Sequence, residues 1–174
     1  MITIIIGTNR QDAVSKNIAH YYQGILKKKG ADSQLLDLKE LPKDFAFSAL
    51  YENSGKNQKF NDFRTKVENS EKFVFIVPEY NGSFPGILKT FIDGLKYPDS
   101  FSQKKCALIG LSSGVQGAGL ALSHLTDIFN YLGMHVFAIK PKLSQINDHF
   151  DGKEISNNLY NELLDQQAEG FIKF

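Results

Sequence analysis

The sequence predicts a doubly wound α/β fold, a three-layer sandwich in which helices cover both faces of a five-stranded parallel sheet. Several apolar runs show no polar alternation, which is typical of strands that are buried on both faces. Between these runs, apolar residues recur at helical spacing. Strand-like and helix-like segments then alternate along the whole chain, which is the pattern of parallel strands joined by crossover helices.

Five segments are predicted to be strands. The three strongest are continuous apolar runs, each followed by a turn residue, and they cover residues 2–6, 73–77 and 106–111. Two weaker segments cover residues 34–38 and 134–139.

Five helices fill the gaps between and after these strands. Residues 15–29 place apolar side chains on one face and stop at Gly30, a natural C-terminal cap. Phe60, Phe63 and Val67 recur at helical spacing, and an apolar stripe over residues 87–95 follows Pro85. The last two predicted helices cover residues 120–132, which end at Gly133, and residues 156–171.

The common arrangement for five such strands is the flavodoxin-like order 2-1-3-4-5, and we expect it here. The length of 174 residues suits a single domain over residues 1–174. Two connections are long, residues 39–57 and 140–154, and long loops in compact domains are often functional or mobile.

Composition excludes several classes of protein. The net charge is +1, and the short basic run at residues 27–29 fits the end of a helix better than a nucleic-acid site. No apolar stretch is long enough for a transmembrane helix, and the N-terminus lacks the pattern of a signal peptide, so we expect a cytoplasmic protein. Cys106, the single cysteine, lies within a predicted strand and is expected to be buried, and the histidines share no metal-ligand spacing.

Ligands of open α/β sheets bind at the carboxyl ends of the strands, beside the point where strand order reverses. The loops after the first, third and fourth strands meet there. The first loop, residues 7–17, is polar and leads into a helix N-terminus, which favours a phosphate over the alternative of an ordinary capped turn. It is neither a Walker A loop nor a G-x-G-x-x-G turn.

The other two loops are rich in glycine and turn residues. Residues 78–86 contain two prolines and an Asn-Gly pair, which fix the backbone, and a tyrosine that can cover a flat ligand. Residues 112–119 contain three glycines, which let the backbone approach a ligand closely.

Together, the three loops resemble those of the NADPH-dependent FMN reductase family, a branch of the flavodoxin-like superfamily that includes quinone, azo and chromate reductases. The resemblance extends from Ile2 to about Ile139, and its most specific element is Pro-Glu-Tyr-Asn-Gly-Ser at residues 78–83. The first loop matches a Gly-Ser/Thr-x-Arg pattern. The third matches Ser-x-Gly-x-x-Gly-Gly, with Ala118 in place of the first paired glycine.

The resemblance implies an FMN site, and the spacing of the histidines predicts no metal site. The resemblance places the phosphate on the first loop, the isoalloxazine ring against the backbone of the second loop, and the third loop on the other side. These residues are Thr8, Arg10, Ser15, Lys16 and Asn17; Pro78, Glu79, Tyr80, Asn81 and Gly82; and Ser112, Ser113, Gly114 and Gln116. The family usually has serine where this chain has Ala13, and we expect Ser15 to compensate in part.

The implied activity is transfer of a hydride from NADPH or NADH to bound FMN, and then to a small acceptor such as free flavin or a quinone. No catalytic side chain is assigned, because the flavin carries the chemistry. The alternatives are a flavodoxin-type electron carrier, which the net charge of +1 disfavours, and a non-catalytic flavin-binding protein. The apolar residues Phe84, Ile87, Phe91 and Tyr97 predict a homodimer, with a tetramer as the alternative.

Overall fold

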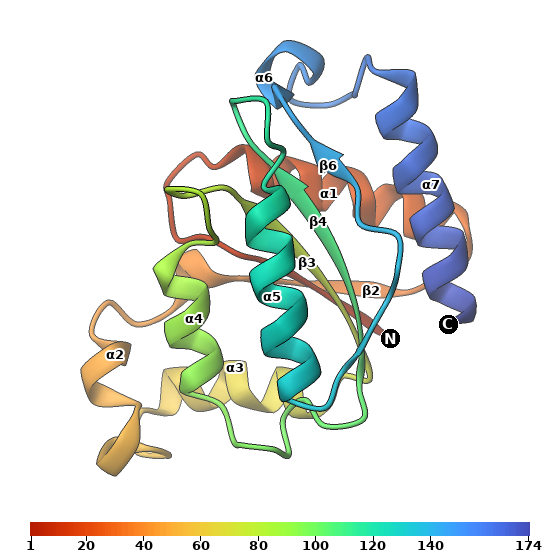
Figure 1. Cartoon of the computed structure of the whole chain (residues 1–174). Coiled ribbons are helices and arrows are strands. Elements are labelled where there is room, and N and C mark those ends of the chain that lie inside the picture. Colours follow the sequence, from red (N-terminus) through yellow and green to blue (C-terminus); the bar gives the residue numbers. More distant parts are fainter.

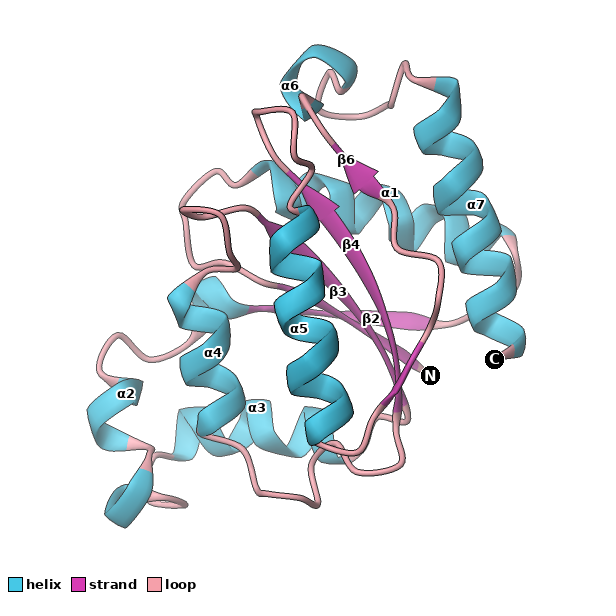
Figure 2. Ribbon diagram, in the orientation of Figure 1, coloured by secondary structure: helices cyan, strands magenta, loops and turns pink.

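The computed structural model describes residues 1–174 and contains a six-stranded parallel sheet between two layers of helices (Figures 1 and 2). The strand order is β2-β1-β3-β4-β5, and β6 also pairs with β4. The strands are β1 (Ile2–Ile6), β2 (Ser33–Asp37), β3 (Lys72–Pro78), β4 (Lys105–Leu111), β5 (His135–Val136) and β6 (Lys142–Leu143). The predicted flavodoxin-like order is confirmed.

The helices form two layers, each with its own apolar core. Side chains of β1, β3 and β4 alternate between the two cores, so Ile4 packs beneath one layer and Ile5 beneath the other. One layer consists of α1 (Val14–Lys28) and α7 (Asn158–Lys173). The other consists of α3 (Gln58–Glu68), α4 (Gly86–Asp93) and α5 (Gly119–Tyr131).

The connection over residues 39–57 was predicted as a loop and is largely structured. It contains the short helices η1 (Leu38–Glu40), α2 (Phe45–Ser48) and η2 (Tyr51–Asn53). Phe45 and Leu50 are buried against α3 and α4. Arg64 of α3 holds the end of this segment, since its Nη2 donates to Ser54 Oγ at 3.1 Å and to the carbonyl of Gly94 at 2.9 Å.

The fifth strand is shorter than the predicted residues 134–139. Only His135–Val136 pair with β4, after which the chain leaves the sheet and returns as β6. Gln167 of α7 fills the gap, because its Nε2 donates to the carbonyl of Leu108 at 2.9 Å and to that of Ile139 at 2.8 Å. The interruption therefore depends on a side chain far along the sequence, which an apolar run cannot indicate.

Cys106 lies in the middle of β4 and is fully buried, as predicted. Burial raises the pKa of its thiol to about 12, so the side chain stays protonated and behaves as a small apolar group. None of the helices combines the length and the apolar character that crossing a membrane requires.

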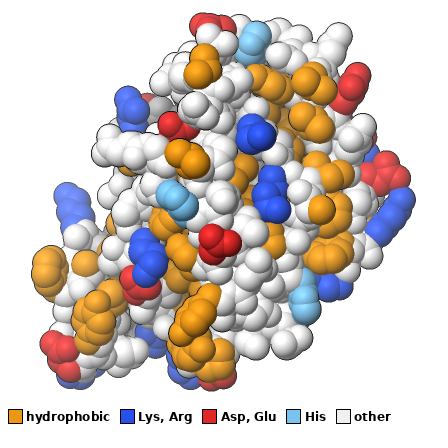
Figure 3. Space-filling model, in the orientation of Figure 1, with side chains coloured by type: hydrophobic (Ala, Val, Ile, Leu, Met, Phe, Trp, Pro, Cys, Tyr) orange, Lys and Arg blue, Asp and Glu red, His pale blue; other side chains and the backbone are white.

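The apolar residues that predicted an interface lie in different environments. Phe91 is fully buried against Phe60 and Phe63 of α3, so its assignment to a surface was wrong. Phe84 and Ile87 are partly buried against the same core. Tyr97 is 66% exposed, and its ring stacks on that of Tyr131 at 6.1 Å. Figure 3 shows hydrophobic side chains at the lower edge of the molecule and others along its right side.

Replacement of Gln167 tests its role in the sheet. Gln167→Leu removes both donors and leaves two carbonyl groups without their partner, so we expect the free energy of unfolding to fall by about 1–3 kcal/mol. Urea denaturation measures the change. Gln166→Leu is the control, because Gln166 is exposed and its replacement should alter stability by less than about 0.5 kcal/mol. Equal stability of the two variants would contradict the proposed role of Gln167.

Candidate functional site

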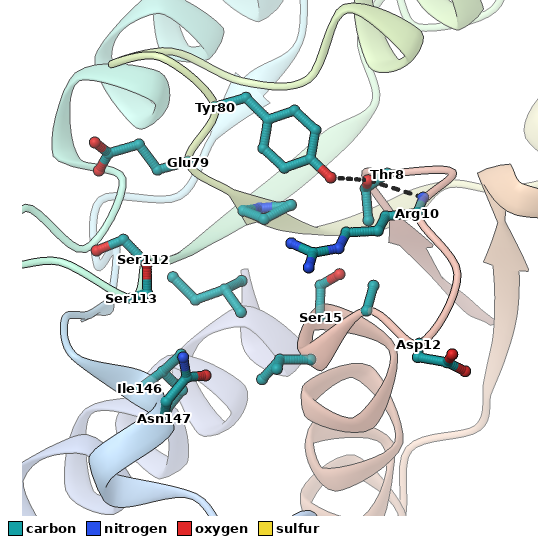
Figure 4. Close-up of a pocket in the computed structure, with 14 residues that line it drawn as sticks. Thr8, Arg10, Asp12, Ser15, Glu79, Tyr80, Ser112, Ser113, Ile146 and Asn147 are labelled. Carbon is teal, nitrogen blue, oxygen red and sulfur yellow. Dashed lines mark hydrogen bonds between the residues drawn. The ribbon is translucent and has the colours of Figure 1, made fainter.

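A cavity of about 190 Å³ lies at the carboxyl ends of β1, β3 and β4 (Figure 4). The three loops predicted to meet there do meet, and a fourth segment beyond β6 completes the wall. The lining residues are Thr8, Arg10, Asp12, Ala13, Val14 and Ser15; Pro78, Glu79 and Tyr80; Leu111, Ser112 and Ser113; and Ile146 and Asn147.

Six of the predicted site residues do not line this cavity. Lys16 and Asn17 line an adjoining cavity beside β2, where Lys16 Nζ pairs with Asp37 Oδ2 at 3.1 Å. Both residues belong to the first turn of α1, and the adjoining cavity shares Thr8, Arg10, Asp12 and Ala13 with the main one. Four others lie on the correct loops but outside the lining set: Asn81, Gly82, Gly114 and Gln116.

The N-terminus of α1 forms one end of the cavity, and the groups there suit a phosphate. Ala13 stands at the N-cap position, so no side chain caps the first turn. Ser15 is 1% exposed and its Oγ has no hydrogen-bond partner. Arg10 extends its guanidinium into the cavity near Ser15 (Figure 4). A buried hydroxyl without a partner is costly, and a phosphate at a helix N-terminus would satisfy it, so these residues fit the phosphate of FMN.

Thr8 and Tyr80 connect the first loop to the second. The two hydroxyl groups are hydrogen-bonded at 2.8 Å, and Thr8 Oγ1 also accepts from the backbone N–H of Arg10 at 3.2 Å. Thr8 is almost fully buried. Its hydroxyl therefore fixes the Tyr80 ring over the cavity. Thr8 is also part of the predicted phosphate loop.

The Asn-Gly pair of the second loop forms a tight turn. Asn81 and Gly82 both have positive φ, at 50° and 72°, and the backbone groups of Tyr80 and Ser83 pair in both directions at 2.8 and 2.9 Å. This is the geometry of a type I′ turn, which Asn-Gly favours. Asn81 and Gly82 thus shape the loop without reaching the cavity.

The third loop is held by its own Ser112 and by Glu79. Ser112 Oγ donates to the carbonyl of Gly114 at 2.7 Å and accepts from the N–H of Gly117 at 2.8 Å. Glu79 Oε2 accepts from the N–H of Ala118 at 3.0 Å. Ala118 precedes α5 in a left-handed conformation, with φ of 62°, and supplies no side-chain cap. The Glu79 carboxylate serves as that cap, and a negative charge is favourable at a helix N-terminus.

The sequence reasoning missed Ile146 and Asn147. They reach the cavity because β6 pairs with the end of β4 and carries the following residues to the third loop. The only sequence signal was the unusual length of the connection over residues 140–154, which did not single out any residue. That connection also contains β6 and the short helix α6 (Ile146–His149).

Comparison with known proteins identifies this architecture. Residues 1–145 match the sequence profile of the NADPH-dependent FMN reductase family. The chain belongs to this family. This reductase therefore depends on FMN and a nicotinamide cofactor, as its three loops predicted.

Individual relatives and solved structures agree with the family. An FMN-dependent NADPH-azoreductase of Staphylococcus saprophyticus is 32% identical, over 97% of this chain and 89% of its own. A 2-hydroxy-1,4-benzoquinone reductase of Burkholderia is 29% identical, over 75% of this chain and 70% of its own. The structure of FerB, an NAD(P)H:(acceptor) oxidoreductase of Paracoccus denitrificans, superposes with a TM-score of 0.80 at 22% identity, covering 99% of this chain and 94% of FerB, and supports the fold.

Two substitutions at the start of α1 test the phosphate site. Ser15→Ala removes a charge-assisted hydrogen bond, so we expect FMN to bind at least about tenfold more weakly. Ala13→Ser adds a hydroxyl beside the same first turn and should tighten FMN binding. Titration of each variant with FMN measures Kd, and riboflavin is the control ligand because it lacks the phosphate. Changes of less than about twofold in both variants, roughly 0.4 kcal/mol, would contradict this assignment.

Proposed function

We propose that the cavity is the FMN site of this reductase, with the phosphate at the start of α1 and the ring between the second and third loops. The observation that carries this proposal is the buried Ser15 hydroxyl, which has no partner and lies beside Arg10 at an uncapped helix N-terminus. The predicted contacts with FMN of the six residues outside the cavity stay predictions; these are Lys16, Asn17, Asn81, Gly82, Gly114 and Gln116.

The residues of the chain bind and orient the cofactor. When bound, FMN supplies the redox chemistry, accepting a hydride and passing its electrons to a second substrate. Arg10 and Ser15 hold the phosphate. Because the phosphate is one end of FMN, this contact also limits where the ring at the other end can lie. Thr8 orients Tyr80 through their hydrogen bond, and Glu79 ties the second loop to the start of α5. No side chain is required to act as a general acid or base.

We propose a planar, conjugated electron acceptor, such as a quinone or free flavin. The named relatives support this class, since one is a benzoquinone reductase and another an azoreductase. An acceptor of this kind can stack on a flat ring with little demand on side-chain chemistry. The sequence does not select between NADPH and NADH as the nicotinamide cofactor. The cytoplasmic location and the single domain over residues 1–174 remain predictions from the sequence.

Anaerobic reduction of the FMN-loaded protein tests this function. We expect NADPH or NADH to remove the visible absorbance of the oxidised flavin within seconds, and a quinone to restore it. Steady-state kinetics with a quinone should then be ping-pong, because both substrates use the same site in turn. Reduction that takes hours would favour an electron carrier, and failure to bind any FMN would favour a protein that retains only the fold.

We also propose a homodimer that uses the exposed tyrosines below α4 and α5. Tyr97 and Tyr131 are 66% and 77% exposed and stack on each other, and Tyr51 lines the same apolar depression. Exposed aromatic clusters of this kind are typical of protein interfaces. This surface replaces the predicted contribution of Phe91, which lies in the core.

Sedimentation of charged variants tests the dimer. The native protein should sediment as a dimer at micromolar concentration, and Tyr97→Glu combined with Tyr131→Glu should give a monomer, because buried unpaired carboxylates are costly. Leu159→Glu on α7 is the control, since Leu159 is also exposed but lies in the other layer of helices. A monomeric native protein would refute the proposal.

A further inference from the structure

One wall of the cavity lies outside the part of the chain that matches the family. The match ends at residue 145, whereas Ile146 and Asn147 line the cavity. In Figure 4 they lie on the side away from Tyr80, below Ser112 and Ser113. The match to the family profile therefore does not include this wall.

The backbone of this wall is fixed against the third loop. Gln145 has a left-handed conformation, with φ of 46°, which is strained for a residue with a side chain. Two hydrogen bonds hold it there. The N–H of Gln145 donates to the carbonyl of Gly114 at 2.8 Å, and that of Ile146 donates to the carbonyl of Ser112 at 3.0 Å. Ile146 is 2% exposed and anchors the turn in the core.

The first turn of α7 holds the wall from the other side. Tyr160 is 8% exposed, and its hydroxyl pairs with Ser144 Oγ at 2.8 Å and donates to the carbonyl of Ser144 at 2.9 Å. The ring of His149 packs edge-on against Tyr160, with 5.6 Å between ring centroids. The segment between Ser144 and His149 is thus clamped on both sides.

This arrangement presents the Asn147 amide at the cavity without a partner in the chain. Asn147 is exposed and lines the cavity, and its side chain makes no hydrogen bond within the protein. A neutral amide offers both donors and an acceptor, which suits hydroxyl groups better than a phosphate or an apolar ring. The proposed function puts the phosphate at Ser15 and the ring between the second and third loops, so the hydroxyl-bearing ribityl chain must span the cavity between them.

We propose that Asn147 is a flavin-recognition residue whose amide hydrogen-bonds the ribityl chain, and that Tyr160 is its positioning residue. The inference rests on the proposed FMN site and adds a contact beyond the family-matched residues. It assigns α7 and the preceding segment a role in selecting ribityl flavins over flavins that lack this chain.

Binding of three flavins by Asn147→Ala tests the inference. FMN and riboflavin both carry the ribityl chain, so we expect each to bind about three- to tenfold more weakly, the loss of one neutral hydrogen bond. Lumiflavin lacks the chain and should bind as it does to the native protein. Asp148→Ala is the matched control, because Asp148 is the exposed neighbour outside the cavity, and it should change none of the three Kd values.

The positioning role of Tyr160 is tested with the same ligands. Tyr160→Phe keeps the ring and removes the hydroxyl that holds Ser144, so we expect weaker binding of FMN and riboflavin and unchanged binding of lumiflavin. A merely structural role would lower the melting temperature without this selectivity. The Ser15→Ala variant gives the complementary pattern, with FMN affected and riboflavin not.

The outcomes separate this inference from the proposed function. If Asn147→Ala binds riboflavin as tightly as the native protein, or loses lumiflavin to the same extent as riboflavin, the ribityl assignment is wrong. A changed KM for the quinone with unchanged flavin Kd would also overturn it, in favour of contact with the acceptor. If the native protein binds neither FMN nor riboflavin, the proposed FMN site itself fails.

Discussion

A parallel sheet covered on both faces leaves only the strand ends for polar chemistry. In this protein the central strands β1, β3 and β4 are buried almost throughout, and their side chains alternate between two apolar cores. Ligand-binding groups therefore have to come from the loops at the carboxyl ends. The strand order 2-1-3-4-5 places the loops after β1, β3 and β4 next to one another, and the cavity lies among them.

The loops form a site because their side chains bond to one another. Tyr80 of the second loop holds Thr8 of the first, and Glu79 of the second loop caps α5 beyond the third. The polar groups of Tyr80 and Glu79 therefore form hydrogen bonds to neighbouring loops. The polar side chains that remain free at the cavity are those of Arg10, Asp12, Ser15, Ser113 and Asn147. Such cross-loop bonds fix the site before a ligand arrives, which reduces the ordering cost of binding.

The parts of this structure that local sequence determines could be predicted. The apolar run of β1 and the helical spacing of α1 each identified an element to within a residue, because burial of a repeated face leaves a direct pattern. Environment was harder to predict than element type. Phe91 belongs to an apolar stripe in either case, but the sequence does not say whether another helix covers it. The loops were located correctly, whereas the direction of the Lys16 side chain on α1 depends on its ion pair with Asp37 at the end of β2.

The interrupted fifth strand shows why the remaining wall of the site could not be predicted. Cys106 pairs with Val136, and Gly110 pairs with Lys142. An advance of four residues along β4 therefore corresponds to an advance of six residues from β5 to β6, so two extra residues leave the sheet. Because side chains alternate with a period of two, an even number of extra residues preserves the face of every later one. Val136 accordingly packs with the core beneath α5, and Leu143, seven residues later, packs with the core beneath α1 and α7. The chain therefore returns in register, supported by Gln167, and delivers Ile146 and Asn147 to the cavity. One helix, α7, thus stabilises the break through Gln167 and the cavity wall through Tyr160, which links the C-terminal end of the chain to a site built mainly from its first two thirds.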